Sequence, residues 1–76
     1  MSNDELKEAL ITQRPIIANL PVYGTLSFAY VSAIIYRRDE NRNIYMEVEL
    51  MDKNRHSVAI VDPKYISYEE QENENE

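Results

Sequence analysis

Residues 44–51 alternate strictly between two sets of side chains, and this alternation constrains the fold more than any other feature. The even positions are occupied by Ile44, Met46, Val48 and Leu50, and the odd positions by Tyr45, Glu47, Glu49 and Met51. Successive side chains of a strand point to opposite faces of the sheet. The pattern therefore predicts a strand whose even-numbered face lies in the core.

A hairpin is predicted after this strand. Residues 52–56 are polar and read as a turn, and residues 57–61 read as a strand with Val58 and Ile60 facing inward. If Leu50 lies opposite Val58, the loop is 53–55, a favoured three-residue length. Asn54 or Arg55 then takes the left-handed conformation, which asparagine tolerates better.

The run 26–38 is rich in β-forming residues, with apolar side chains at both odd and even positions. Such a strand is central, is covered by the helix, or is part of an interface. It follows a loop over 20–25 that contains Gly24, the only glycine of the chain, which we expect to have a positive φ. The polar residues 39–43 predict the next turn.

The remaining elements complete a mainly β fold. A helix is predicted over 2–12, capped by Ser2 or Asn3, and short strands are predicted over 15–19 and 65–68. The order favours a small SH3-like, partly closed antiparallel barrel, with an open sheet carrying the helix on one face as the alternative. The expected organisation is an N-terminal helix in 1–14, a β-barrel domain in 15–68 and a disordered acidic tail in 69–76.

Composition limits the chemistry of the chain. The 76 residues include no cysteine and one histidine, and the net charge is −6. Five glutamates lie in 69–76, so residues 1–68 carry nine acidic and eight basic groups. No apolar run reaches the roughly 18 residues of a membrane span, and the N-terminus lacks the basic flank of a signal peptide. We expect a cytoplasmic protein that does not associate with membranes.

Three groups of residues contain side chains that are used in catalysis or metal binding. Asp39, Asn41 and Asn43 resemble the start of a calcium loop, but Ile44 and Leu50 stand where glycine and glutamate are needed. His56 and Ser57 are strand neighbours and should diverge, and the Glu47 and Glu49 carboxylates have no cleft beside them. The sequence predicts no enzyme activity, no cofactor and no metal.

Two segments carry a resemblance. The stretches 31–37 (VSAIIYR) and 48–63 (VELMDKNRHSVAIVDP) resemble small uncharacterised proteins encoded by phages and prophages of Gram-positive bacteria. The similarity covers about residues 12–68 and rests on packing and turn patterns. It implies a phage or mobile-element origin and a β-barrel, and it assigns no functional residues.

The expected function is binding. Tyrosine and arginine are enriched at interface hot spots. They surround one predicted hairpin, whose candidate partner-binding residues are Tyr36, Arg37, Arg38, Arg42 and Tyr45. The leading hypothesis is a non-enzymatic protein that binds and modulates or inhibits a bacterial host protein, such as a defence component. The alternatives are a barrel that binds or mimics nucleic acid, and an oligomeric sponge for a nucleotide messenger.

Self-association is also expected, because a strand that is apolar on both faces leaves one face to be covered. A homodimer or higher homo-oligomer is predicted on the outward residues of two strands. These residues are Ile34, Tyr36, Tyr45, Glu47 and Met51.

Overall fold

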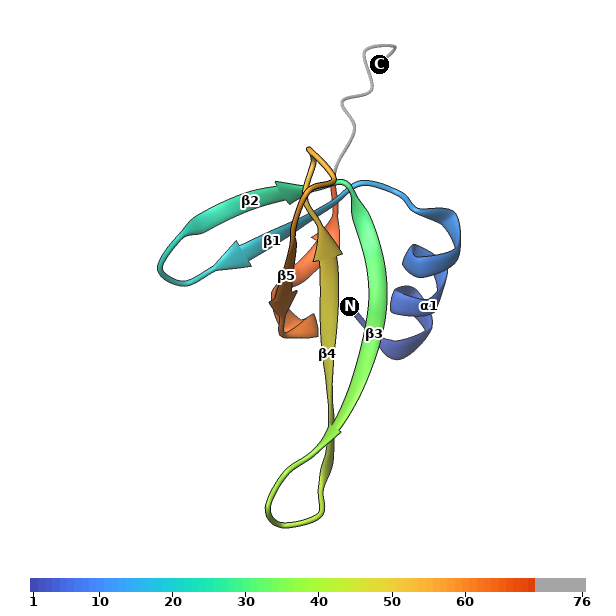
Figure 1. The fold of residues 1–76 in the computed structure, drawn as a ribbon, viewed down its shortest axis with the longest axis vertical. Helices are drawn as coiled ribbons and strands as arrows, with labels where there is room; N and C mark the ends of the chain where they lie inside the picture. Colours follow the sequence, from blue (N-terminus) through green and yellow to red (C-terminus); the bar gives the residue numbers. More distant parts are fainter. Residues whose placement is uncertain (70–76) are drawn as a thin grey trace.

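The computed structural model describes residues 1–69, and residues 70–76, which hold most of the expected acidic tail, lie outside the described part. The elements are α1 (Asn3–Thr12), β1 (Ile16–Leu20), β2 (Gly24–Phe28), β3 (Tyr30–Arg38), β4 (Ile44–Met51), β5 (Val58–Val61), the 3₁₀ turn η1 (Pro63–Tyr65) and β6 (Ile66–Tyr68). The expected mainly β class with a short N-terminal helix is confirmed (Figure 1).

Helix α1 begins with a complete capping box, as the sequence indicates. The Ser2 hydroxyl accepts from the Glu5 backbone N–H at 3.2 Å, and the Glu5 carboxylate accepts from the Ser2 N–H at 2.9 Å. The hydrogen bond from the Ser2 backbone N–H to the carboxylate, and after it the interaction with the Ser2 side chain, hold the pKa of Glu5 below its ordinary value. The helix ends at Gln13, which adopts a left-handed conformation two residues before Pro15.

The strands form two separate antiparallel sheets, in the orders β2-β1-β6 and β3-β4-β5. No closed barrel is formed by residues 1–69, so the barrel expectation is confirmed only as far as a small antiparallel β fold. The predicted single strand over 26–38 is interrupted at Ala29, where the chain passes from β2 to β3 and from one sheet to the other. At the other end, the capped turn at Pro63 separates β5 from β6, which belong to different sheets.

A β-bulge at Ser32 explains why β3 is apolar at both parities. Val31 lies opposite Leu50, whereas Ala33 lies opposite Glu49 and Ile34 opposite Val48. Directly opposed residues of an antiparallel pair share a face. The inward face of β3 therefore carries Val31 before the bulge and Ile34 after it. An extra residue in one strand shifts the alternation in this way.

The predicted register of the β4–β5 hairpin is wrong by one residue. Leu50 lies opposite Ala59, and Met51 lies opposite Val58. A shift of one residue reverses the face of every side chain. Val58 and Ile60 therefore point outward, 47% and 44% exposed, and Val61 is buried instead. Arg55, not Asn54, takes the left-handed conformation in the turn.

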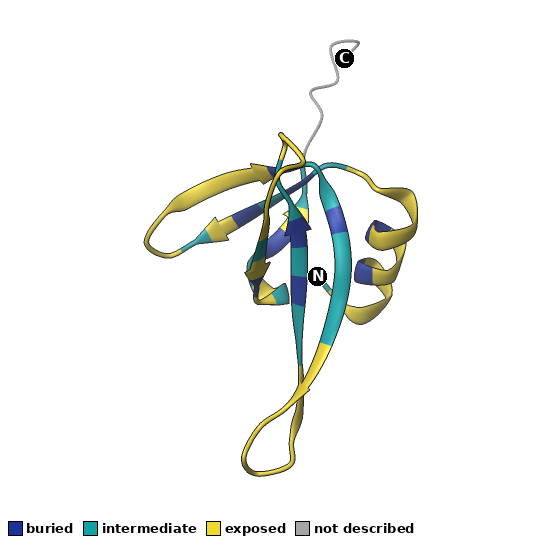
Figure 2. Ribbon diagram, in the orientation of Figure 1, coloured by how far each residue is buried: buried dark blue, intermediate teal, exposed yellow. Residues whose placement is uncertain are grey.

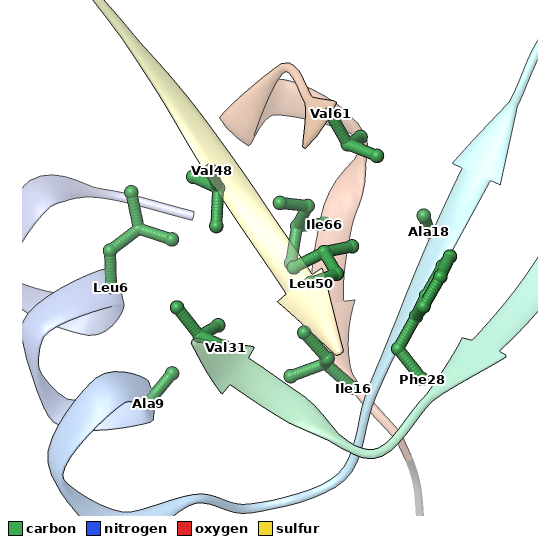
Figure 3. Close-up of a cluster of buried hydrophobic side chains, with 10 residues drawn as sticks. All are labelled: Leu6, Ala9, Ile16, Ala18, Phe28, Val31, Val48, Leu50, Val61 and Ile66. Carbon is green, nitrogen blue, oxygen red and sulfur yellow. The ribbon is translucent and has the colours of Figure 1, made fainter. Parts of the chain in front are cut away.

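The core lies between α1 and the inward faces of the two sheets (Figures 2 and 3). Its fully buried large side chains are Leu6, Ile16, Val31, Val48 and Leu50. The even-numbered face of β4 is thus confirmed as core over Val48 and Leu50. Leu6 and Ala9 are the buried residues of α1, whereas Leu10 is 36% exposed.

Both ends of β1 are fixed by local geometry. The predicted loop over 20–25 is shorter than expected, because Leu20 already pairs with Gly24, whose φ of 79° confirms the expected positive value. At the other end, the Glu69 N–H donates to Pro15 O at 3.1 Å.

No helix within residues 1–69 is long and apolar enough to cross a membrane. The α-helix α1 has ten residues.

Candidate functional site

The strands β3 and β4 continue past the rest of the molecule and end in a turn, and residues 36–45 are called the arm below. Figure 1 shows the arm pointing away from α1 and from the β1–β2 hairpin. Figure 2 shows that burial ends where the arm begins. All of its residues are exposed. The five candidate partner-binding residues all lie on it.

The turn of the arm is organised by the Asp39 side chain. One carboxylate oxygen accepts from the backbone N–H groups of Asn41 and Asn43 at 2.8 and 2.9 Å. The Asp39 N–H donates to Asn43 O at 2.9 Å, and Arg42 takes a left-handed conformation with φ 68°. The D-x-N-x-N pattern is therefore used for a hairpin turn, as the sequence favours.

The arm has two faces, and the structure divides the candidate residues between them. Arg37 lies opposite Tyr45 on the face turned away from the core. Tyr36 lies opposite Met46 and Arg38 opposite Ile44, on the continuation of the core-facing side. Tyr36 and Tyr45 therefore point to opposite sides of the arm.

The core-facing side of the arm carries two largely exposed side chains, Tyr36 and Ile44, beside Arg38. Tyr36 is 59% exposed and Ile44 is 72% exposed. The Tyr36 hydroxyl donates to the Asn3 side chain at 3.2 Å, which places it beside the start of α1. Helix α1 therefore covers the inward face of β3 only as far as Tyr36, and Ile44 extends beyond it.

The outward side of the arm combines an aromatic ring with an ion pair. Tyr45 is 46% exposed, and the Arg37 guanidinium is paired with the Glu47 carboxylate on the same face. Arg38 and Arg42 form no salt bridge with another residue of 1–69. The arm thus carries charges of both signs, with Asp39 and Glu40 beside its three arginines.

The candidate self-association residues do not share one surface. Ile34 and Tyr36 lie on the core-facing side, opposite Val48 and Met46. Tyr45, Glu47 and Met51 lie on the outward side of β4. Only the second group belongs to the outward face of the β3-β4-β5 sheet.

A further group of basic side chains, Lys53, Arg55 and His56, lies at the β4–β5 turn. Lys53 is 3.4 Å from the Glu69 carboxylate, and the Arg55 guanidinium lies 5.7 Å from the centre of the Tyr30 ring. The Ser57 hydroxyl donates to Asp52 at 3.3 Å. These contacts stabilise the turn and place the serine against a carboxylate.

One exposed feature, the tip of the β1–β2 hairpin, was not predicted from the sequence. Val22 and Tyr23 are 84% and 76% exposed there. The sequence signal for this tip is a pair of apolar residues within a turn that is bounded by Pro21 and Gly24.

Residues 1–69 contain no detectable pocket and no grouping of three or more metal-ligating side chains. Comparison with family models, curated proteins and solved structures finds no match to the chain.

Proposed function

We propose that this chain is a non-enzymatic binding protein that engages another protein through the arm. The observation that carries the proposal is the exposure of Tyr36, Ile44 and Tyr45 on a hairpin that extends past the core. The resemblance to phage and prophage proteins makes a bacterial host protein the expected partner, whose activity the chain would modulate or inhibit.

The chemistry of the arm suits a protein interface. Aromatic residues and arginine contribute most to interface hot spots, and the arm offers both on each side. Its turn is held by the hydrogen bonds of Asp39, so less conformational entropy is lost on binding than for an unstructured loop. A partner cleft that receives the arm can contact both faces at once.

The charges of the arm favour a protein over a nucleic acid. A phosphate backbone is bound by a surface with an excess of positive charge. Here Arg37 is neutralised by Glu47, and Asp39 and Glu40 directly follow Arg38 in the chain. The two alternatives are nucleic-acid binding or mimicry, and capture of a nucleotide messenger between subunits. The capture experiment described below distinguishes both from protein binding.

We retain the SH3-like, partly closed barrel as a proposal for the finer architecture. Its support is the continuous path from β2 to β3 through Ala29, whose N–H donates to Met51 O at 2.8 Å. The chain thus changes sheets while it stays hydrogen-bonded to β4.

A capture experiment with matched variants tests the function. The full chain, tagged and immobilised, is exposed to nuclease-treated lysate of a Gram-positive host. A double variant, Tyr36→Ala with Arg38→Ala, removes arm contacts. The control is Val22→Ala with Tyr23→Ala at the other exposed hairpin tip.

We expect one protein to be captured by the parent and the control, and at least about tenfold less by the arm variant. Equal capture by all three proteins would contradict the proposal. Retention only without nuclease would favour nucleic acid, and a mass increase by a nucleotide in native mass spectrometry would favour the messenger sponge.

A further inference from the structure

Strand β5 is an unprotected sheet edge. Within residues 1–69 it pairs with β4 on one side and has no strand on the other. Its sequence is Val-Ala-Ile-Val, with no charge, no proline and no bulge. Natural proteins block exposed edges with these devices because an open edge can pair with another strand.

The hydrogen-bond pattern shows which backbone groups of β5 face the open side. The Asp52 N–H donates to Ser57 O at 3.0 Å, so this opposed pair is hydrogen-bonded. Antiparallel pairs alternate between hydrogen-bonded and non-hydrogen-bonded. Ala59 and Val61 therefore direct their backbone groups toward β4, and Val58 and Ile60 direct theirs outward along the free edge.

The same two residues carry the exposed side chains of the strand. Val58 and Ile60 are 47% and 44% exposed on the outward face of the sheet. Met51, half-buried, lies opposite Val58 and joins it to Tyr30. A free row of donors and acceptors therefore borders an apolar surface.

We propose that β5 pairs antiparallel with β5 of a second copy of this chain across a two-fold axis. A two-fold axis of this kind keeps the outward faces of both sheets on the same side, so residues of equal parity must be opposed. With Ala59 opposite Ala59, each Val58 lies opposite Ile60 of the other copy. This register satisfies the N–H and C=O groups of both residues in both chains and gathers their four side chains into one apolar cluster.

Other symmetric arrangements fit less well. Stacking the outward faces would bury Glu47 and Glu49, which lie on the central strand, and burying carboxylates without new partners is strongly unfavourable. Centring the pairing on Ile60 places Val58 opposite Asp62. This inference concerns a surface distinct from the arm and does not depend on the proposed function.

The remaining free edges are also weaker candidates. Strand β3, the other edge of the same sheet, contains the bulge at Ser32, and bulges are among the features that block edge pairing. Strand β2 presents Thr25 and Ser27 on its outward face, and β6 has only three residues. Neither β2 nor β6 presents two exposed apolar side chains on its outward face, as β5 does with Val58 and Ile60.

Sedimentation equilibrium of the full chain tests the interface. We expect the mass to rise with concentration from 9.0 kDa toward that of a dimer. Ile60→Lys places like charges across the axis and should raise the dissociation constant at least about tenfold. The control Tyr45→Lys introduces the same charge at similar exposure on the same face (46% against 44%) and should leave the dissociation constant unchanged.

Circular dichroism establishes that both variants retain the parent fold. A 9.0 kDa species at every concentration, or equal weakening by both lysines, overturns the proposal.

A single cysteine fixes the register, because the natural chain has none. Opposed residues of a non-hydrogen-bonded pair have Cα atoms about 4.5 Å apart, within disulfide range. Ala59→Cys should therefore form a covalent dimer under mild oxidation, and the control Ser67→Cys on β6 should not. Two results would overturn the two-fold β5 pairing. One is a covalent dimer of Ser67→Cys with none of Ala59→Cys, and the other is a covalent dimer that forms only when the two variants are mixed.

Discussion

Both faces of the β3-β4-β5 sheet carry apolar side chains, but these side chains have opposite environments. On the inward face Val31, Val48 and Leu50 are at most 1% exposed, whereas on the outward face Tyr45, Val58 and Ile60 are 44–47% exposed. The difference arises because α1 and the second sheet cover one face only (Figure 2). In this sheet, an apolar side chain is buried only where α1 or the second sheet covers it.

The largest expected effect comes from truncating the inward face. Leu50→Ala should lower the free energy of unfolding by about 2–5 kcal/mol, because Leu50 is fully buried and its truncation leaves a cavity in the core. Ile60→Ala, on the outward face, should lower it much less. Urea denaturation at low protein concentration measures both, and equal losses would mean that the two faces are not different in the way described.

If Leu50→Ala does not fold, Val48→Ala gives a milder test at an equally buried position. Its loss should still exceed that of Ile60→Ala.

A smaller effect is expected from weakening the cover of the inward face. Ser2→Ala removes the hydroxyl that caps α1 and should destabilise the protein by about 1 kcal/mol. Ser2→Asp supplies another capping oxygen and should retain most of the stability. The midpoints of thermal unfolding of the two variants are compared with that of the parent. An unchanged midpoint for Ser2→Ala would show that the cap does not stabilise α1 on the sheet.

The same cap gives a pH dependence. The pKa of Glu5 is lowered in the folded state, so the ionised carboxylate contributes to the stability of the fold. This contribution is fully present above the ordinary carboxyl pKa and is lost as the pH falls through the lowered value. Glu5→Gln keeps a hydrogen-bonding side chain without the titration. The acid-side loss of stability should be smaller in this variant than in the parent, and parallel pH profiles for the two proteins would contradict the assignment to Glu5.

The smallest effect is expected from the outward face. Tyr45→Lys should change the unfolding free energy of the monomer by no more than about 0.5 kcal/mol, because the side chain is half exposed and packs on no core residue. Chemical denaturation at low concentration tests this. A loss comparable with that of Leu50→Ala would place Tyr45 in the core.

Local patterns predicted several elements well. The alternation over 44–51, the polar turn over 39–43 and the cap at Ser2 each depend on interactions between residues close in sequence. Two features escaped prediction for the same reason. The bulge at Ser32 and the hairpin register at Met51 and Val58 are set by pairing between strands, and apolar residues at both parities of β5 fit either register.

The candidate site was predicted in part. The sequence placed Tyr36, Arg37, Arg38, Arg42 and Tyr45 at one hairpin, and the structure places them on one arm. It could not divide them between two faces, because the division depends on the register of β3 against β4. The exposure of Val22 and Tyr23 depends on how far β1 and β2 extend from the body, which no local pattern specifies.

The sequence by itself determined that this is a small, mainly β chain with a capped N-terminal helix and turns at fixed positions. These properties follow from side-chain periodicity, capping chemistry and the single glycine, all of which act over a few residues. The tertiary structure decided that the strands form two sheets, that the chain changes sheets at Ala29, and that Val58 and Ile60 face outward. Those outcomes depend on contacts between segments distant in the chain, where a shift of one residue exchanges the buried face for the exposed one.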